Sequence, residues 1–171
     1  HIYHINLENG KWKQITNGDW EVTKYHGMDA EKNRVFYTSN EGGTIHRGLY
    51  SIGINGDGKI KLSSKVGTHN STFSNGMKYY SNTYSTADIP PYISLHNSNG
   101  KKIRVLEDND ELISTMNEFD LSEKEFFNFK TSEDIELNGW MIKPSDFDVS
   151  KKYPVFMFLY GGPGSQQVLN S

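Results

Sequence analysis

The stretch LYSIGINGDGKIKL, residues 49–62, decides the fold because its pattern occurs again further along the chain. Its first part, 49–52, corresponds to YISL at 92–95, and its last part, 59–62, corresponds to KIRV at 102–105, both 43 residues later. Between the two parts lies NGDG, a sequence that permits positive φ angles and closes antiparallel hairpins. The stretch therefore predicts a hairpin that belongs to a repeating unit.

The repeat extends beyond this hairpin. VFY at 35–37 corresponds to KYY at 78–80, and IYHI at 2–5 followed by QIT at 14–16 forms an earlier, partial copy. Repeats of about 40–50 residues with four strands each are typical of β-propeller blades. We therefore expect a mainly β chain with two full blades and the last half of a third, too few to close a ring of about 4–8 blades. The alternative is a plain antiparallel meander with accidental similarity.

Composition agrees with a mainly β structure and excludes several classes of protein. Only 35% of the 171 residues are hydrophobic, while Gly, Tyr and Phe number 16, 10 and 9, which favours strands and tight turns. The net charge of −3 argues against a nucleic-acid partner. The absence of cysteine excludes disulfides, thiolate zinc sites and a cysteine nucleophile. No apolar run reaches ~18 residues and no signal peptide is visible, although an upstream part could carry either.

Charge is divided unevenly along the chain and marks a boundary near Glu107. Residues 1–106 carry 13 Lys and Arg against 8 Asp and Glu, whereas residues 107–171 carry 5 against 13. The pattern of the sequence changes at the same point. We expect the C-terminal blades of a propeller over 1–106, a connecting helix over 107–121, and the start of a second, incomplete domain over 122–171.

The second part begins with a short helix and a hairpin. DNDELISTMNEF at 108–119 predicts the helix, because Asp108 or Asn109 can cap it and its apolar residues share one face. EFFNFKT at 125–131 and ELNGWMIK at 136–143 predict the two antiparallel strands, with the turn at SED between them.

A buried strand and a glycine-rich loop are expected to follow. The continuous apolar run YPVFMFL at 153–159 predicts a strand covered on both faces, and it ends in YGGPG at 160–164. A hairpin, a buried strand and a Gly-rich loop are the opening of an α/β-hydrolase sheet, in which the loop after the third strand supplies half of the oxyanion hole. Glycines there let the backbone approach the scissile carbonyl closely and adopt positive φ.

Five stretches resemble the dipeptidyl peptidase IV subfamily of the prolyl oligopeptidase family of serine peptidases, in order and spacing. They are KKYPVFMFLYGGPGSQQV at 151–168, ITNGDWEV at 15–22, KYYSNTYS at 78–85, IRVLEDN at 103–109 and LNGWMIKPSDFD at 137–148. The resemblance covers the whole chain. It implies an internal piece that runs from the last blades of an eight-bladed propeller into the first strands of an α/β-hydrolase domain.

The resemblance assigns one site residue, Tyr160. In the family, the tyrosine that opens this loop donates its hydroxyl to the oxyanion of the tetrahedral intermediate. The second donor is the backbone N–H after the nucleophile, which is expected beyond Ser171. Without the resemblance, Tyr160 would be read as an ordinary aromatic residue at the end of a strand.

The triad itself is not expected in this chain. No Gly-x-Ser-x-Gly motif occurs, and Ser165 lacks both flanking glycines, so a loop or helix-capping role suits it better. In α/β hydrolases the base follows the nucleophile, which excludes all six histidines from that role; they are His1, His4, His26, His46, His69 and His96. The glutamates that bind a substrate's amino terminus in the family have no match here. Asp110-Glu111 and Glu133-Asp134 are expected to be solvated helix-start and turn residues.

No metal or cofactor site is expected. His4, His26 and His46 lack the spacing of metal ligands, and residues 55–58 lack the remaining acidic ligands of a calcium loop, so a hairpin turn is the better interpretation. Trp12, Trp20 and Trp140 are expected to pack between blades or under the hydrolase sheet.

The resemblance implies a serine exopeptidase that releases X-Pro or X-Ala dipeptides through an acyl-enzyme, with these 171 residues inactive alone. Peptides with penultimate Pro or Ala would be the substrates, and the full-length protein would be a homodimer, periplasmic, envelope-associated or secreted. Two alternatives stay open: a relative with tripeptidyl or acylaminoacyl specificity, and a non-catalytic propeller that serves as a binding module.

Overall fold

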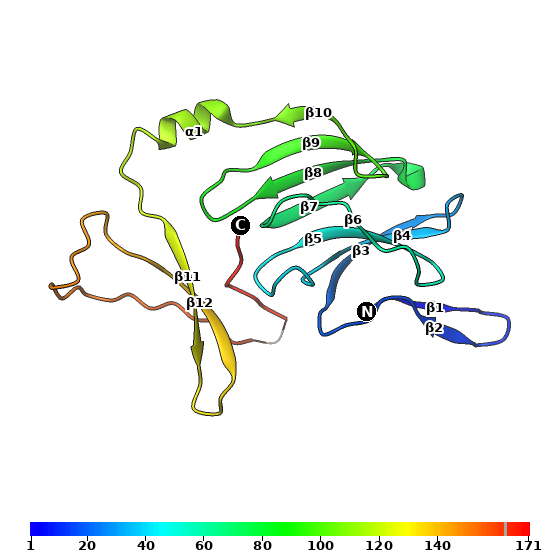
Figure 1. The fold of residues 1–171 in the computed structure, drawn as a ribbon, viewed down its shortest axis with the longest axis horizontal. Coiled ribbons are helices and arrows are strands. Elements are labelled where there is room, and N and C mark those ends of the chain that lie inside the picture. The colour runs from blue at the N-terminus through cyan, green and yellow to red at the C-terminus, as the bar shows by residue number, and fades with distance from the viewer. Residues whose placement is uncertain (163) are drawn as a thin grey trace.

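The structure is a computed structural model that describes residues 1–162 and 164–171. It is mainly β, with four antiparallel sheets that each join strands consecutive in sequence. The first sheet is a hairpin of β1 (Tyr3–Ile5) and β2 (Trp12–Gln14). Figure 1 shows this hairpin beside the first of two larger sheets. The expected half-blade at the start of the chain is therefore present.

The two larger sheets have four strands each, as the repeat predicts. One contains β3 (Val22–Asp29), β4 (Arg34–Ser39), β5 (Gly48–Gly53) and β6 (Ile60–Lys61), in that order. NGDG at 55–58 lies in the β5–β6 connection, as expected for a hairpin turn. We call this sheet the first blade.

The other sheet, called the second blade, repeats the same order of strands. It contains β7 (Thr68–Phe73), β8 (Tyr79–Ser85), β9 (Tyr92–Asn97) and β10 (Lys102–Glu107), with the 3₁₀ turn η1 (Asn75–Met77) between β7 and β8. Figure 1 shows the two blades adjacent, with β7 nearest to the first blade. The β-propeller-like arrangement expected from the 43-residue repeat is confirmed.

Two clusters of buried side chains hold these sheets together. In β4, Val35 and Tyr37 point to one face and Phe36 to the other, as strand geometry requires. The first cluster joins the β1–β2 hairpin to the first blade; it contains Ile15, Val35, Tyr37, Tyr50 and Ile52. The second joins the two blades; it contains Phe36, Leu49, Leu62, Met77 and Tyr80. The first blade is therefore covered on both faces.

The two blades also meet through their backbones. Arg47 and Thr68 form a parallel bridge, in which the Arg47 N–H donates to Gly67 O at 3.0 Å and the His69 N–H donates to Arg47 O at 2.9 Å. Gly67 has a φ of 143°, and a Cβ there would lie 2.6 Å from Ser85 O. Only glycine allows this close approach of the strands.

After the second blade comes α1 (Asp110–Met116). Asn109 is its N-cap residue, but it adopts a left-handed φ of 58° and makes no capping hydrogen bond to the helix with its side chain. The side-chain amide instead donates to Pro91 O, which ties the helix start to the β8–β9 connection. The helix was expected at this place with Asp108 or Asn109 as its cap, and Asp108 makes the contact, because its Oδ1 accepts from the N–H of Asp110, the first helical residue, at 3.3 Å.

A hairpin of β11 (Lys124–Lys130) and β12 (Glu136–Ile142) follows, within a residue of its expected bounds. Phe127 lies opposite Gly139, and its ring is so close that a Cβ on the glycine would meet it at 2.5 Å. The glycine in the middle of β12 therefore makes room for an aromatic side chain.

The strand predicted over 153–159 is absent from the described residues, and this prediction was wrong. The segment is assigned to no strand, and its side chains are exposed, with Val155 at 84% and Phe156 at 93%. A continuous apolar run becomes a central strand only where neighbouring strands and covering helices exist. No strand of the described chain pairs with it. The opening of an α/β-hydrolase sheet is thus not formed beyond its hairpin.

Candidate functional site

Tyr160 lies at the end of the exposed apolar run and opens a tight turn. The Ser165 N–H donates to Gly162 O at 3.2 Å, and Gly164 has the positive φ, 74°, that was expected of this loop. A Cβ on Gly162 would lie 2.7 Å from Tyr160 Oη, so the ring rests against the bare backbone of that glycine. Pro163 lies outside the described residues. The glycines therefore shape the loop around the tyrosine side chain.

The hydroxyl of Tyr160 is accessible. The side chain is 58% exposed, and within the described part of the chain its Oη makes no hydrogen bond. Ser165 is five residues away in sequence, and its Oγ accepts a hydrogen bond from Gln167 Nε2 at 3.0 Å, with no histidine beside it. This agrees with a loop serine and with a tyrosine whose donor is free for a ligand.

Residues 165–171, which we call the docking tail, return from this loop to the two blades. Figure 1 shows the C-terminus beside the end of β7, where the blades meet. The Asn170 N–H donates to Ile45 O at 2.9 Å, and Thr68 Oγ1 donates to Asn170 O at 2.8 Å. Gln166 Nε2 donates to Thr44 O at 2.8 Å. The sequence did not predict a role for Gln166 or Asn170, because polar residues are common after a glycine-rich loop.

Three of the six histidines, His26, His69 and His96, are hydrogen-bonded within the blades. His26 Nε2 and Thr38 Oγ1 are 2.8 Å apart, and burial, helped by the charge of Lys24, lowers the pKa of His26 to about 4. His69 is buried, its Nδ1 lies 3.1 Å from Asn82 Nδ2, and desolvation lowers its pKa. Neutral, hydrogen-bonded imidazoles of this kind are structural. Among the described residues no group of three or more metal-ligating side chains occurs.

The acidic pairs take the places expected of them. Asp110 and Glu111 lie exposed in the first turn of α1, where they face the positive end of the helix dipole. Asp134 has a left-handed φ of 61° in the β11–β12 turn and pairs with Lys130 at 2.7 Å. Neither pair lines either of the two hollows described below.

Of the three tryptophans, only Trp20 is packed as predicted. It stacks on Tyr37 with ring centroids 6.1 Å apart, against the first core cluster. Trp12 is 67% exposed and meets only the edge of Tyr3, and Trp140 is partly exposed on β12 under Lys124. The prediction was wrong for these two because the surfaces that would cover them are not formed by the described chain.

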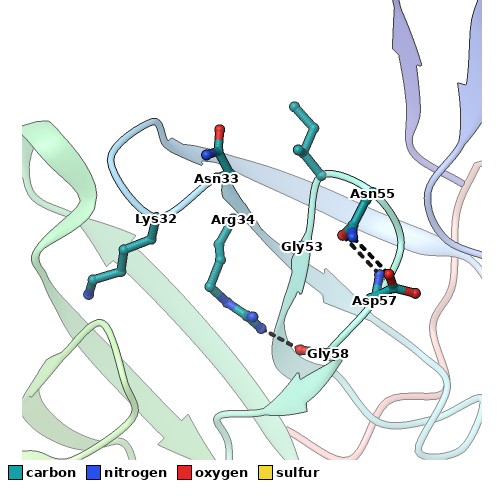
Figure 2. Close-up of a pocket in the computed structure, with 8 residues that line it drawn as sticks. Lys32, Asn33, Arg34, Gly53, Asn55, Asp57 and Gly58 are labelled. Atoms are coloured by element: carbon teal, nitrogen blue, oxygen red, sulfur yellow. Dashed lines mark hydrogen bonds between the residues drawn. The ribbon is translucent and has the colours of Figure 1, made fainter.

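A hollow at the turns of the first blade is not the candidate site. It has a volume of about 520 Å³ and is lined by the β3–β4 turn and the β5–β6 turn. Figure 2 shows that three of its polar side chains are already bonded: the Arg34 guanidinium donates to Gly58 O, and Asn55 and Asp57 bond to each other. The hollow is therefore a consequence of two hydrogen-bonded turns.

A second hollow, of about 210 Å³, lies between the blades around the buried His69. Its polar wall includes Asn82, which also accepts a hydrogen bond from Ser71 Oγ at 3.0 Å. Lys65 lies over the rings of Tyr84 and Tyr92, at 5.1 and 5.8 Å from their centroids. These contacts hold His69, Asn82 and Lys65 to neighbouring side chains of the same blade.

In the part of the chain that the structure describes, no helix is long and apolar enough to cross a membrane.

Comparison with known proteins shows what the chain is similar to. Residues 1–91, which contain the β1–β2 hairpin, the first blade and the first two strands of the second blade, match the family described as the dipeptidyl peptidase IV N-terminal region. A probable dipeptidyl-aminopeptidase B of Trichophyton verrucosum is 36% identical over 97% of this chain, and a probable dipeptidyl peptidase 4 of Aspergillus flavus is 30% identical over 98%. The chain spans only 19% and 22% of the length of these relatives.

Solved structures give the same result. A crystal structure of Porphyromonas gingivalis dipeptidyl peptidase 4 superposes with a TM-score of 0.92 and 45% identity, and the match covers 99% of this chain and 24% of that one. A putative dipeptidyl aminopeptidase IV of Bacteroides ovatus gives a TM-score of 0.78 and 28% identity, over 94% of this chain and 23% of that one. With the match over 1–91, these findings show that the chain belongs to the dipeptidyl peptidase IV family.

Proposed function

We propose that this chain is a segment of a serine exopeptidase that releases N-terminal X-Pro or X-Ala dipeptides. The names of its relatives support a peptidase, and the chain spans about a fifth of their length. In this proposal, residues 1–106 are C-terminal propeller blades, 107–121 connect them to the next domain, and 122–171 open an α/β-hydrolase domain. The serine, acid and histidine of the triad then lie outside these 171 residues, which have no activity alone.

The observation that carries the proposal is the free, exposed hydroxyl of Tyr160 on a glycine-shaped loop. When a serine attacks the carbonyl carbon of the substrate's second residue, the carbonyl oxygen gains negative charge. Tyr160 Oη donates a hydrogen bond to that oxyanion, the peptide amine leaves with a proton, and water then hydrolyses the acyl-enzyme. A donor held at the place where charge develops stabilises the transition state more than the substrate.

The proposal is tested by changing Tyr160→Phe in a full-length peptidase that contains this chain, with a Gly-Pro chromogenic substrate. Loss of one oxyanion donor costs about 10²–10³-fold in kcat. Tyr25→Phe is the control, because Tyr25 is a similarly exposed tyrosine, at 55%, on β3. Full activity of Tyr160→Phe would overturn the oxyanion assignment, and inactivity of the unmodified protein towards any peptide would overturn the peptidase itself.

Substrate preference is tested with a panel. Gly-Pro and Gly-Ala derivatives should be cleaved much faster than a tripeptidyl or an N-acetylated substrate, because an exopeptidase of this kind requires a free amine two residues before the scissile bond. The reverse order would favour tripeptidyl or acylaminoacyl specificity. Size-exclusion chromatography with light scattering then tests the proposed homodimer of the full-length protein.

A further inference from the structure

The docking tail, residues 165–171, is held at one place, the end of the blades where β5 and β7 meet. We call this place the blade junction; it consists of Thr44, Ile45, Arg47, Thr68 and Ala87. Arg47 and Thr68 already join the two blades there through their parallel bridge. The tail therefore contacts both blades at the point where they are fixed to each other.

Asn170 reaches three separate segments of the junction. Its N–H donates to Ile45 O at 2.9 Å in the first blade, and its C=O accepts from Thr68 Oγ1 at 2.8 Å in the second. Its side-chain Oδ1 accepts from the Ala87 N–H at 2.8 Å, in the β8–β9 connection. All three distances are those of well-formed hydrogen bonds. Of these three bonds, only the last requires the asparagine side chain.

Gln166 makes the second attachment, to the first blade. Its Oε1 accepts from Arg47 Nη2, while its Nε2 donates to Thr44 O at 2.8 Å. The other arm of the Arg47 guanidinium donates to Thr44 O and His46 O, at 3.0 and 2.7 Å. The guanidinium is thus fixed by the loop before β5, and its charge strengthens the bond to Gln166.

These attachments lie a few residues after Tyr160. Gly161, Gly162 and Gly164 separate the tyrosine from Ser165, and glycine-rich segments have many accessible backbone conformations. The hydrogen bond between Ser165 and Gly162 fixes the turn only relative to the residues that follow it. Gln166 and Asn170 therefore attach the C-terminal side of the loop to the blade junction.

We propose that Gln166 and Asn170 are positioning residues, which place the hydroxyl of Tyr160 in the oxyanion hole by anchoring its loop to both blades. This inference rests on the proposed role of Tyr160. A misplacement of about 1 Å can cost ~10²-fold in rate, because a hydrogen bond to the oxyanion depends steeply on distance and direction. The propeller then contributes to catalysis through the geometry of the loop.

The test uses the full-length peptidase and matched side chains at 170. Asn170→Leu keeps the volume and removes the acceptor for the Ala87 N–H, whereas Asn170→Asp keeps an acceptor oxygen in the same place. We expect Asn170→Leu to lower kcat about 10- to 100-fold with KM changed less than about 3-fold, and Asn170→Asp to stay within about 3-fold. Rates are divided by the number of active serines, counted by phosphonylation to completion, so that misfolded protein does not contribute.

The same change in a Tyr160→Phe background separates positioning from simple support of the fold. If Asn170 acts through the tyrosine hydroxyl, Asn170→Leu should cost less than about 3-fold once that hydroxyl is gone. Gln166→Met should behave in the same way, since it removes all three side-chain hydrogen bonds of Gln166, to Arg47, Thr44 and Val168.

Two results would overturn the inference while leaving the proposed function intact. One is full kcat per active serine in Asn170→Leu, and the other is an equal loss with and without the Tyr160 hydroxyl. If Tyr160→Phe alone retains full activity, the oxyanion assignment fails first, and the positioning role fails with it.

Discussion

Buried histidines give the blades a dependence on pH that can be assigned to single residues. The pKa of His26 is lowered to about 4 from 6.5, first by burial and then by Lys24. Between these two pKa values, the His26 imidazole is therefore neutral in the folded protein and protonated in the unfolded chain. The contribution of His26 to the free energy of unfolding is fully present above about pH 6.5. It is lost as pH falls towards 4, because the unfolded state binds more protons than the folded state in that range.

We predict that His26→Gln reduces this acid sensitivity. Glutamine can still bond to Thr38 Oγ1, the partner of His26 Nε2, and does not titrate. The drop in Tm between about pH 7.5 and about pH 5 should be smaller in the variant than in the unmodified protein. An unchanged drop would mean that other groups, such as His69, whose pKa is also lowered, account for it.

The sequence singled out one residue of the candidate site and missed two others. Tyr160 was selected because the run around it resembles a known family, and its role stays a prediction; the structure shows only that its side chain is exposed. Gln166 and Asn170 were missed because the contacts that hold them to the blades join residues 83 to 125 positions apart in sequence. No local pattern encodes such a separation.

Among the elements, the strands of the two blades could be predicted from the sequence because each blade buries one face against its neighbour. In β8, Tyr80 is 2% exposed, while the adjacent Tyr79 is 51% exposed. Tyr80 stacks between Phe73 and His96, with ring centroids 4.9 and 5.0 Å away. Alternation of this kind, with Asn-Gly turns at regular spacing, is visible in a sequence.

This pair of tyrosines provides a matched test of packing between the blades. Tyr80→Ala should destabilise the protein by about 3–5 kcal/mol, through lost apolar burial and the cavity it leaves. Tyr79→Ala should change the free energy of unfolding by less than about 1 kcal/mol, since its side chain is largely in solvent. Urea unfolding followed by circular dichroism measures both, and equal effects would contradict the assigned core.

The element that the sequence did not predict correctly is the run 153–159. Hydrophobicity indicated a central strand, but a strand of that kind is stabilised by its neighbours in the sheet, and the described chain pairs none with it. At the start of α1 the sequence left Asp108 and Asn109 open as the cap. Asp108 Oδ1 accepts from the Asp110 N–H at 3.3 Å, whereas Asn109 bonds to Pro91 O, a partner from another part of the chain. Contacts distant in sequence therefore decide both whether the run forms a strand and which way Asn109 turns.

For the molecule as a whole, exposed apolar side chains at 155–160 predict self-association of the 171-residue chain. Phe156 and Leu7 are equally exposed, at 93% each, but Phe156 lies within a continuous apolar run, whereas Leu7 lies alone in the β1–β2 turn. Phe156→Asp should therefore reduce association, measured by light scattering, and Leu7→Asp should have little effect. Equal effects would show that the run is not the associating surface.

The long separation between the docking tail and its partners has a consequence for the order of events during synthesis. Thr68 and Asn170 are 102 residues apart, so their hydrogen bond closes a long loop and cannot form until the intervening chain exists. A ribosome releases both blades before residue 170 emerges, and their pairings between neighbouring strands need no later segment. The loop that carries Tyr160 is consequently ordered only after its support has folded, so its final geometry depends on completion of the blades.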